Sequence, residues 1–297
     1  MGAKLRIVRR RIRSVQSTMK ITRAMELIAA SRIVRAQQRV EAARPYAELL
    51  TRAMEDVAAQ TGGLVHPLLE EREDPRAGGV FVVTSDRGLA GSYNSNVLRL
   101  TEQRIADVRR RGLEPVLYVS GKKGIGYFRF RQVPIEESWS GFSEVPTHEA
   151  AERIGSKLIE DFASRRIDEL TAVYTDFRSA FTLRQTAKRF LPLAPEEVAP
   201  TQREARAEYL FEPEPAEILD ELLPAYVVTK VFAALLESAA SENAARRRAM
   251  KAATDNAEEL MKVLTRQANR ARQDEITTEI MEIVGGAEAL AAKSAEE

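Results

Sequence analysis

The chain has 297 residues, of which 45 are Lys or Arg and 44 are Asp or Glu, so the formal net charge is +1. This balance excludes a uniformly basic nucleic-acid coat protein and an acidic tail protein, while 44% hydrophobic residues are enough to build a core. Cysteine is absent, which excludes disulfide frameworks, thiol nucleophiles and cysteine-bound zinc. Only 6% of the residues are aromatic and 30% are charged, a composition typical of chains with much long, exposed helix.

Charge is divided unevenly between the two ends of the chain. Residues 1–44 carry twelve basic and two acidic groups, whereas residues 213–297 carry ten basic and sixteen acidic groups. The two ends are therefore electrostatically complementary, which favours their pairing with each other over self-association of either end.

The first predicted element is a long helix between Leu5 and Ala59, a stretch that contains one proline, Pro45, and no glycine. Its apolar positions recur in alternating steps of four and three, and Glu26 is the only charge on this seam, with Met25 beside it. The pattern favours one strand of a coiled coil over the alternative, an amphipathic helix packed on a globular domain. The seam residues are Val8, Ile12, Val15, Met19, Thr22, Ala29, Ile33, Ala36, Val40 and Ala43.

Strand and helix patterns alternate in the middle of the chain, after a loop rich in Gly and Pro at Thr61–Gly79. Such alternation predicts β-α-β units, and so a small, mostly parallel sheet covered by helices. The predicted elements are the strand Val80–Thr84, the helix Asn96–Arg111, the strand Pro115–Ser120, the helix Thr147–Arg165, the strand Leu170–Phe177 and a more polar edge strand, Ala187–Leu193.

A second long helix is predicted from about Ala216 almost to the end of the chain, because Pro224 is the only proline after Pro215 and no glycine precedes Gly285. At about 1.5 Å per residue, some 70 helical residues make a rod of roughly 100 Å, far longer than a globular core requires. The apolar stripe changes phase along this helix, which indicates that its partner changes at that height. The first stripe is Ala257, Met261, Leu264, Ala268 and Ala271, and the second is Ile276, Ile280, Ile283, Ala287 and Leu290.

The predicted fold class is α/β plus coiled coil. We expect a long antiparallel two-helix coiled coil from the N- and C-terminal segments, with a Rossmann-like α/β domain inserted between them. The predicted domains are residues 1–60 for the N-terminal coiled-coil helix, 61–212 for the α/β domain and 213–297 for the C-terminal coiled-coil helix. The last helix is expected to overhang its partner by on the order of 25 Å.

The α/β segment contains two motifs that could carry chemistry. Gly121–Gly126 follows a strand and could cradle a phosphate, but it lacks the residue order of nucleotide-binding loops and could equally form a tight basic turn. Asp86 follows the carboxyl end of the first strand without an identifiable catalytic partner, which favours bracing of a turn. His66 and His148 lack the spacing of metal ligands, so we predict no metal and no cofactor. The alternative function is therefore an α/β enzyme for a phosphate-bearing ligand, with a coiled-coil oligomerisation arm.

The basic residues raise a DNA-binding alternative. The first helix and Arg246–Arg248 could act as a basic region, which would bind duplex DNA with a steep dependence on salt. A basic region should be followed by a parallel zipper, whereas here a whole α/β segment intervenes, so the sequence disfavours this alternative.

Three motifs resemble those of one known family, in the same order. They are KITRAMELIAAS at Lys20–Ser31, DRGLAG at Asp86–Gly91, and a tail that runs from Ser241 to the segment ITTEIMEIVGGAEA at Ile276–Ala289. The family is the gamma subunit of F-type ATP synthase. Because the likeness covers both ends and the centre of the chain, the whole length resembles this family.

The resemblance implies a function and a set of partners. The chain would be the central rotor stalk of the proton-translocating enzyme, transmitting rotation of the membrane c-ring to the catalytic hexamer to drive ATP synthesis. It would have no catalytic residue of its own. The implied partners are the alpha, beta and epsilon subunits and the c-ring, with one copy per complex. The implied location is peripheral, at the cytoplasmic face of the bacterial plasma membrane.

The resemblance also implies contact residues. Met25 would lie near the acidic lever loop of a beta subunit, and the catch loops of the hexamer would contact Arg246, Gln273 and Thr277. An apolar, non-directional surface can turn inside a collar without breaking fixed hydrogen bonds. We therefore predict a bearing surface on the overhanging stripe of Ile276, Ile280 and Ile283.

Overall fold

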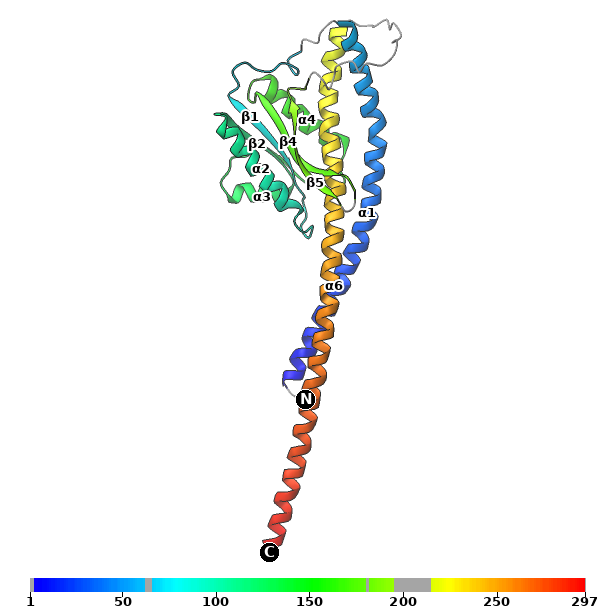
Figure 1. Ribbon diagram of the computed structural model, residues 1–297, viewed down its shortest axis with the longest axis vertical. Helices are drawn as coiled ribbons and strands as arrows, with labels where there is room; N and C mark the ends of the chain where they lie inside the picture. Colours follow the sequence, from blue (N-terminus) through cyan, green and yellow to red (C-terminus); the bar gives the residue numbers. More distant parts are fainter. Residues whose placement is uncertain (1–2, 62–65, 180–181, 195–214, 297) are drawn as a thin grey trace. The chain divides into compact units, whose positions relative to one another are not determined.

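The computed structural model describes residues 3–61, 66–179, 182–194 and 215–296 (Figure 1). The chain forms two compact units. The helix-pair unit combines Met1–Ile28 with Arg248–Glu297, and the sheet unit comprises Ala29–Arg247. Two long helices, α1 (Ala3–Thr61) and α6 (Pro215–Glu296), each contribute to both units.

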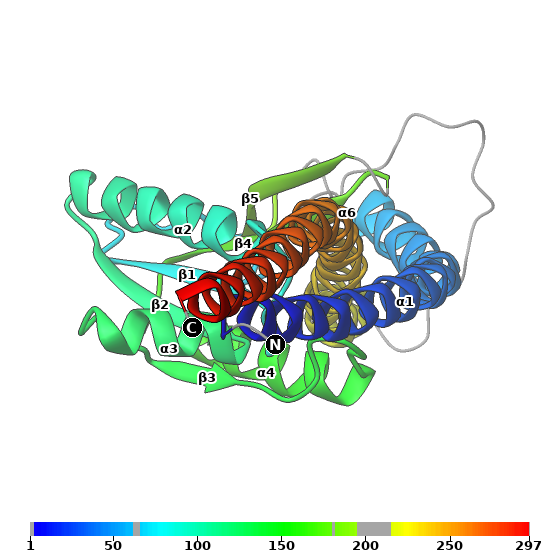
Figure 2. The ribbon, with the colours of Figure 1, turned by 90° about the horizontal axis from the view of Figure 1, so that it is seen from below.

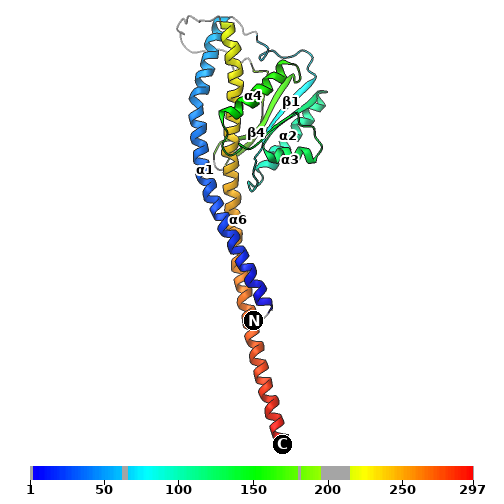
Figure 3. The same ribbon diagram turned by 180° about the vertical axis from the view of Figure 1, so that it is seen from behind.

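In the helix-pair unit, α1 and α6 run antiparallel and side by side (Figures 1 and 3). Thr22 and Thr254 are both buried in the contact, and their hydroxyl oxygens lie 2.8 Å apart in a hydrogen bond between the two helices. Glu26, the charge on the predicted seam, is also buried and accepts a hydrogen bond of 2.9 Å from Arg23. The buried apolar residues of this unit are Leu5, Met250, Ala257, Leu264 and Ala271.

The end of α6 has no helical partner within this unit, because it continues beyond the N-terminal end of α1 (Figures 1 and 3). Side chains from Ile276 to Ala287 are all exposed, Ile276 by 45%, Ile280 by 55% and Ile283 by 71%. The phase change in the sequence therefore marks the point at which the stripe leaves the helix pair.

The sheet unit contains a five-stranded sheet with the order β3-β2-β1-β4-β5. Strands β1 to β4 are all parallel to one another, and the edge strand β5 runs antiparallel to β4. The bounds are Ala77–Val83 for β1, Glu114–Ser120 for β2, Glu137–Trp139 for β3, Glu169–Phe177 for β4 and Leu183–Leu191 for β5.

Helices cover both faces of this sheet, which is why β1 is buried along its whole length. The face with Val80 and Val82 packs against α2 (Tyr93–Arg110), which lies along the sheet in Figure 2, and against α3 (Lys122–Phe130). The opposite face, with Phe81 and Val83, packs against α4 (His148–Ala163) and the sheet-unit part of α6.

The structure confirms the predicted fold class, since α1 and α6 pair antiparallel and the α/β elements lie between them in the chain. The predicted strands and helices are all present, with bounds shifted by a few residues. Two elements were missed: α3, whose Gly124 and Gly126 disfavour helix, and β3, which has only three residues. The three-domain division stays a prediction, because the two units divide both long helices internally.

Close packing of α4 on α6 gives a stability prediction. A Cβ added at Gly155 of α4 would lie 2.7 Å from Val228 Cγ2 of α6, whereas one at Gly126 of α3 would meet open space. We expect Gly155→Ala to lower the free energy of unfolding by about 1–3 kcal/mol through overpacking. The matched variant Gly126→Ala should be neutral or stabilising by up to about 1 kcal/mol. Urea unfolding of the purified variants checks this, and equal effects at the two positions would contradict it.

Candidate functional site

The turn after β1 is organised by the carboxylate of Asp86. Its Oδ2 accepts hydrogen bonds from the backbone N–H groups of Gly141, at 2.8 Å, and Ser143, at 3.1 Å. Its Oδ1 accepts one from the backbone N–H of Lys122, at 3.1 Å. The Asp86 backbone N–H in turn donates to Ser143 Oγ at 2.9 Å. Asp86 therefore braces the ends of two strands, as the sequence interpretation favoured, and contacts no catalytic partner among these groups.

The same contacts occupy the position that a phosphate would need. At the N-terminus of α3, Lys122 N–H binds Asp86, Lys123 N–H binds the Ser85 carbonyl oxygen, and Gly124 N–H binds Thr84 Oγ1. The anion-binding amides of this helix end are thus satisfied within the chain itself. The geometry argues against the alternative of a phosphate-ligand enzyme built on this loop.

Helix α6 covers the edge of the sheet where ligands usually bind. In an open α/β sheet that edge is the crevice at the carboxyl ends of the strands where the strand order reverses, here between β1 and β4. Ser241 Oγ of α6 donates to the Thr175 carbonyl oxygen of β4 at 3.2 Å, and Ala245 packs against Ala90 and Tyr93 beyond β1. The crevice is therefore filled by the protein's own helix.

Arg246 forms a buried ion pair inside α6. Its Nη2 lies 2.5 Å from Glu242 Oε1, and the two side chains are 6% and 1% exposed. Nη2 also donates to the Gly88 carbonyl oxygen at 3.4 Å. Burial raises the pKa of Glu242, and the neighbouring Arg246 opposes that rise. The residue predicted to contact a partner thus has well-defined partners within the sheet unit.

Glu144 joins this pair to two further segments. Its carboxylate lies 2.5 Å from Arg32 Nη1 of α1, 3.5 Å from Arg87 Nη1 after β1, and 3.9 Å from Arg246 Nη1 of α6. We call these four residues the Glu144 cluster. Side-chain exposure rises from 6% at Arg246 and 17% at Glu144 to 38% at Arg32 and 68% at Arg87. The cluster therefore extends from the interior to the surface.

The other predicted contact residues lie in the helix-pair unit. Met25 is partly buried in α1, while Gln273 and Thr277 are exposed on α6. Thr277 Oγ1 donates to the Gln273 carbonyl oxygen at 3.0 Å, one helical turn back. Gln273 and Thr277 are therefore open to a partner, and their predicted roles stay predictions.

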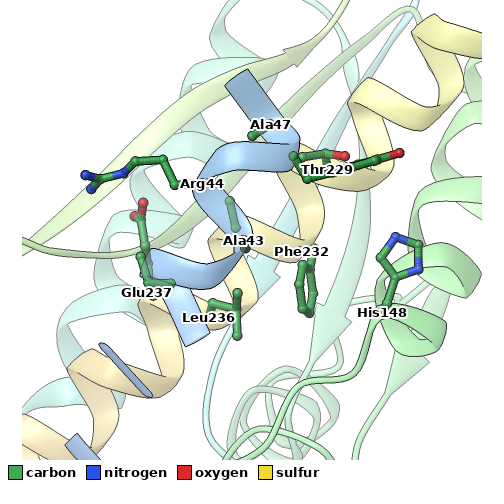
Figure 4. A pocket seen from close by; sticks show the side chains of 11 residues that line it. Ala43, Arg44, Ala47, His148, Thr229, Phe232, Leu236 and Glu237 are labelled. Carbon is green, nitrogen blue, oxygen red and sulfur yellow. The ribbon is translucent and has the colours of Figure 1, made fainter. Parts of the chain in front are cut away.

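A cavity of about 340 Å³ lies between α1, α6 and the start of α4 (Figure 4). Its wall is largely apolar, and the ring of Phe232 stands edge-on to His148 with 5.7 Å between ring centres. The lining residues with polar groups are Arg44, Tyr46, His148, Thr229 and Glu237. His148 is thus an exposed residue that contributes a ring contact to the cavity wall.

Glu237, on the wall of this cavity, is one half of a carboxyl pair between α6 and β4. Burial, together with the charge of Asp176 and a hydrogen bond with it, raises the pKa of Glu237 to about 7, while Lys188 opposes the rise. Asp176 also accepts a hydrogen bond of 2.8 Å from Arg178 Nε. Glu237 therefore gains or loses its proton near neutral pH.

Among the residues that the structure describes, no group of three His, Asp or Glu residues is placed to hold a metal ion. None of the helices in the described ranges is both long and apolar enough to cross a membrane.

Comparison with known proteins identifies the family. The sequence profile of the ATP synthase family matches residues 4–290. The ATP synthase gamma chain of Thermobifida fusca is 54% identical over 303 residues, covering 99% of each chain. That of Acidothermus cellulolyticus is 55% identical over 303 residues, covering 100% of each chain. The chain belongs to the ATP synthase gamma chain family. The family predicted from the three motifs is confirmed.

Solved structures share the fold. A chain from the central stalk and c-ring of Tetrahymena thermophila mitochondrial ATP synthase aligns with a TM-score of 0.59 and 24% identity, over 78% of this chain and 99% of that chain. A chain from the Euglena gracilis mitochondrial ATP synthase, in rotational state 3, aligns with a TM-score of 0.66 and 16% identity, over 99% of this chain and 97% of that one. These likenesses support the fold class of this gamma chain family member.

Sequence reasoning missed two groups that the structure brings together. Glu144 lies in a loop without periodicity, so no sequence signal pointed to its three arginines. Asp176 did carry a signal, since it is a charge at the end of an otherwise apolar strand, but its partner Glu237 lies on a distant helix.

The buried ion pair of Arg246 and Glu242 should contribute to the stability of the sheet unit. Arg246→Ala leaves the Glu242 carboxylate buried without its cation, so we expect a loss of about 3–5 kcal/mol in the free energy of unfolding. Arg247→Ala, at the exposed neighbouring position, should change it by no more than about 0.5 kcal/mol. Replacing both partners, Arg246→Leu with Glu242→Leu, should recover part of the loss. Urea denaturation measures all three; a loss at Arg246 no larger than at Arg247 would count against the pair.

The carboxyl pair generates a pH prediction. Because the folded pKa of Glu237, about 7, is above its ordinary value of 4.5, its stabilising contribution is complete below pH 4.5 and is lost as pH rises through 7. We expect Glu237→Gln to remove this part of the pH dependence, a difference of about 1–3 kcal/mol between pH 5 and 8.

The matched control is Glu221→Gln, at an exposed position on the same helix. Unfolding by urea at a series of pH values measures the effect. Parallel curves for the wild type and Glu237→Gln would show that Glu237 ionises at its ordinary pKa.

Proposed function

We propose that this chain is the central rotor stalk of a proton-translocating F-type ATP synthase, transmitting rotation of a membrane c-ring to the catalytic alpha/beta hexamer. The observation that carries the proposal is family membership over the full chain length, together with an antiparallel helix pair whose end is apolar and exposed. A shaft must resist twisting, and two packed helices resist it better than one because each restrains the other along the seam.

The exposed end of α6 has the surface that a turning shaft needs. Ile276, Ile280 and Ile283 present apolar side chains, and apolar contact has no preferred direction. Such a surface can rotate within a collar of partner residues while fixed hydrogen bonds are neither formed nor broken. We assign these three residues to the bearing.

We also infer that the chain has no catalytic residue of its own. Asp86 occupies the anion position at α3, and α6 fills the crevice at the carboxyl edge of the sheet. Catalysis would then take place on partner subunits, and this chain would act on them mechanically.

The proposed partners are the alpha and beta subunits, the epsilon subunit and the c-ring, with one copy of this chain per complex. Its proposed location is peripheral, at the cytoplasmic face of the bacterial plasma membrane. In the helix-pair unit, Met25, Gln273 and Thr277 are proposed contacts with the hexamer. Arg246 is a proposed contact as well, in addition to its pairing with Glu242.

Reconstitution with alpha and beta subunits tests the function. We expect steady multi-site ATP hydrolysis to require this chain. A chain that ends at Gln273 lacks the three bearing isoleucines, so it should assemble but deliver less torque. A chain that ends at Gly286 keeps them and should match the full chain. Torque is measured with a bead attached to the rotor.

Three results would refute the proposal. One is identical turnover of the hexamer with and without the chain. The other two are turnover by the purified chain alone and tight nucleotide binding that Lys122→Ala abolishes, and either of them would support the enzyme alternative.

A further inference from the structure

Within the sheet unit, the Glu144 cluster is a meeting point of four segments that are distant in the chain. Arg32 belongs to α1 and Arg246 to α6, while Arg87 and Glu144 lie in the loops that follow β1 and β3. A single carboxylate therefore contacts both long helices and the turn after the central strand of the sheet.

The loop that carries Glu144 is itself held to the sheet. Asp86, directly before Arg87, binds the backbone N–H groups of Gly141 and Ser143, and Ser143 Oγ accepts from the Asp86 N–H. The two loops thus form one hydrogen-bonded body at the carboxyl ends of the strands. A force applied to the sheet reaches Glu144 through these bonds.

Ion pairs between side chains differ from apolar packing in their response to sideways force. Apolar contacts between the helices and the sheet have no preferred direction and permit sliding, whereas an arginine–carboxylate contact has a fixed geometry. The cavity beside His148 shows that packing between α1, α6 and α4 is incomplete nearby. Ser241 and Arg246 already bond α6 to the sheet, and the Glu144 cluster adds a short contact of 2.5 Å with Arg32 of α1.

We propose that Glu144 is a positioning residue that locks the α/β elements to both long helices, so that torque passes between them without slip. This role rests on the proposed rotor function. Arg32 and Arg87 are substantially exposed, so their pairs contribute little to the free energy of unfolding. The Glu144 cluster therefore affects the stiffness of the connection between the α/β elements and the two long helices more than the free energy of unfolding.

The first test uses the isolated full-length chain and does not depend on the rotor function. In Glu144→Gln, amide hydrogen exchange in residues 86–91 and 141–146 should speed up by about twofold to fivefold, because the loops lose their ionic contacts with the helices but keep the Asp86 hydrogen bonds. Glu152→Gln, at an exposed position on α4, is the matched control and should leave these segments unchanged. Arg32→Gln removes only the contact between Glu144 and α1. It replaces Glu144→Gln in this test if Glu144→Gln does not fold.

The second test uses the complex reconstituted with alpha and beta subunits, with a bead on the α/β elements. Glu144→Gln should lower the torsional stiffness of the rotor while unloaded ATP hydrolysis stays as in the wild type. Glu152→Gln should change neither the torsional stiffness nor the rate of hydrolysis. Exchange and stiffness equal to those of Glu152→Gln would overturn the role of Glu144. A wild-type chain that fails to support turnover would instead refute the rotor function, while the exchange result would still decide whether Glu144 holds the loops.

Discussion

The burial of one short stretch of α6, from Ser238 to Arg246, is the constraint on which the sheet unit depends. Its side chains are almost all small or paired, which lets the helix approach the carboxyl edge of the sheet closely enough for Ser241 to bond the β4 backbone. The same approach places Arg246 beside the turn after β1 and brings Glu237 against Asp176. Filling this edge removes the usual ligand site of the fold and converts it into a structural contact.

Much of the fold could be predicted because the patterns that indicate its helices and strands lie within short stretches of sequence. Heptad steps gave the two long helices, and short apolar runs gave β1, β2 and β4, since periodicity and composition depend only on neighbouring residues. The missed elements had weak local signals: α3 contains two internal glycines, and β3 is three residues long. Their conformations follow from contacts with β2, which sequence periodicity does not encode.

The site was less predictable than the fold, because its contacts join distant parts of the chain. The motif around Asp86 was singled out from the sequence, yet its three backbone partners come from the start of α3 and from the loop after β3. Glu144 has no distinguishing neighbours, and only the folded chain brings Arg32, Arg87 and Arg246 to it. Arg246 was proposed from family resemblance as an outward contact, whereas its burial beside Glu242 became visible only in three dimensions.

The exposed apolar end of α6 also bears on how such a chain is made. Met281 and Val284 lie beside the three isoleucines and are exposed by 70% and 52%. The end of α6 therefore exposes several large apolar side chains close together. An apolar patch of this kind promotes self-association until another protein covers it. When the chain is made in excess of the proteins that cover this segment, we expect it to self-associate, so a single helix end favours balanced synthesis of the subunits.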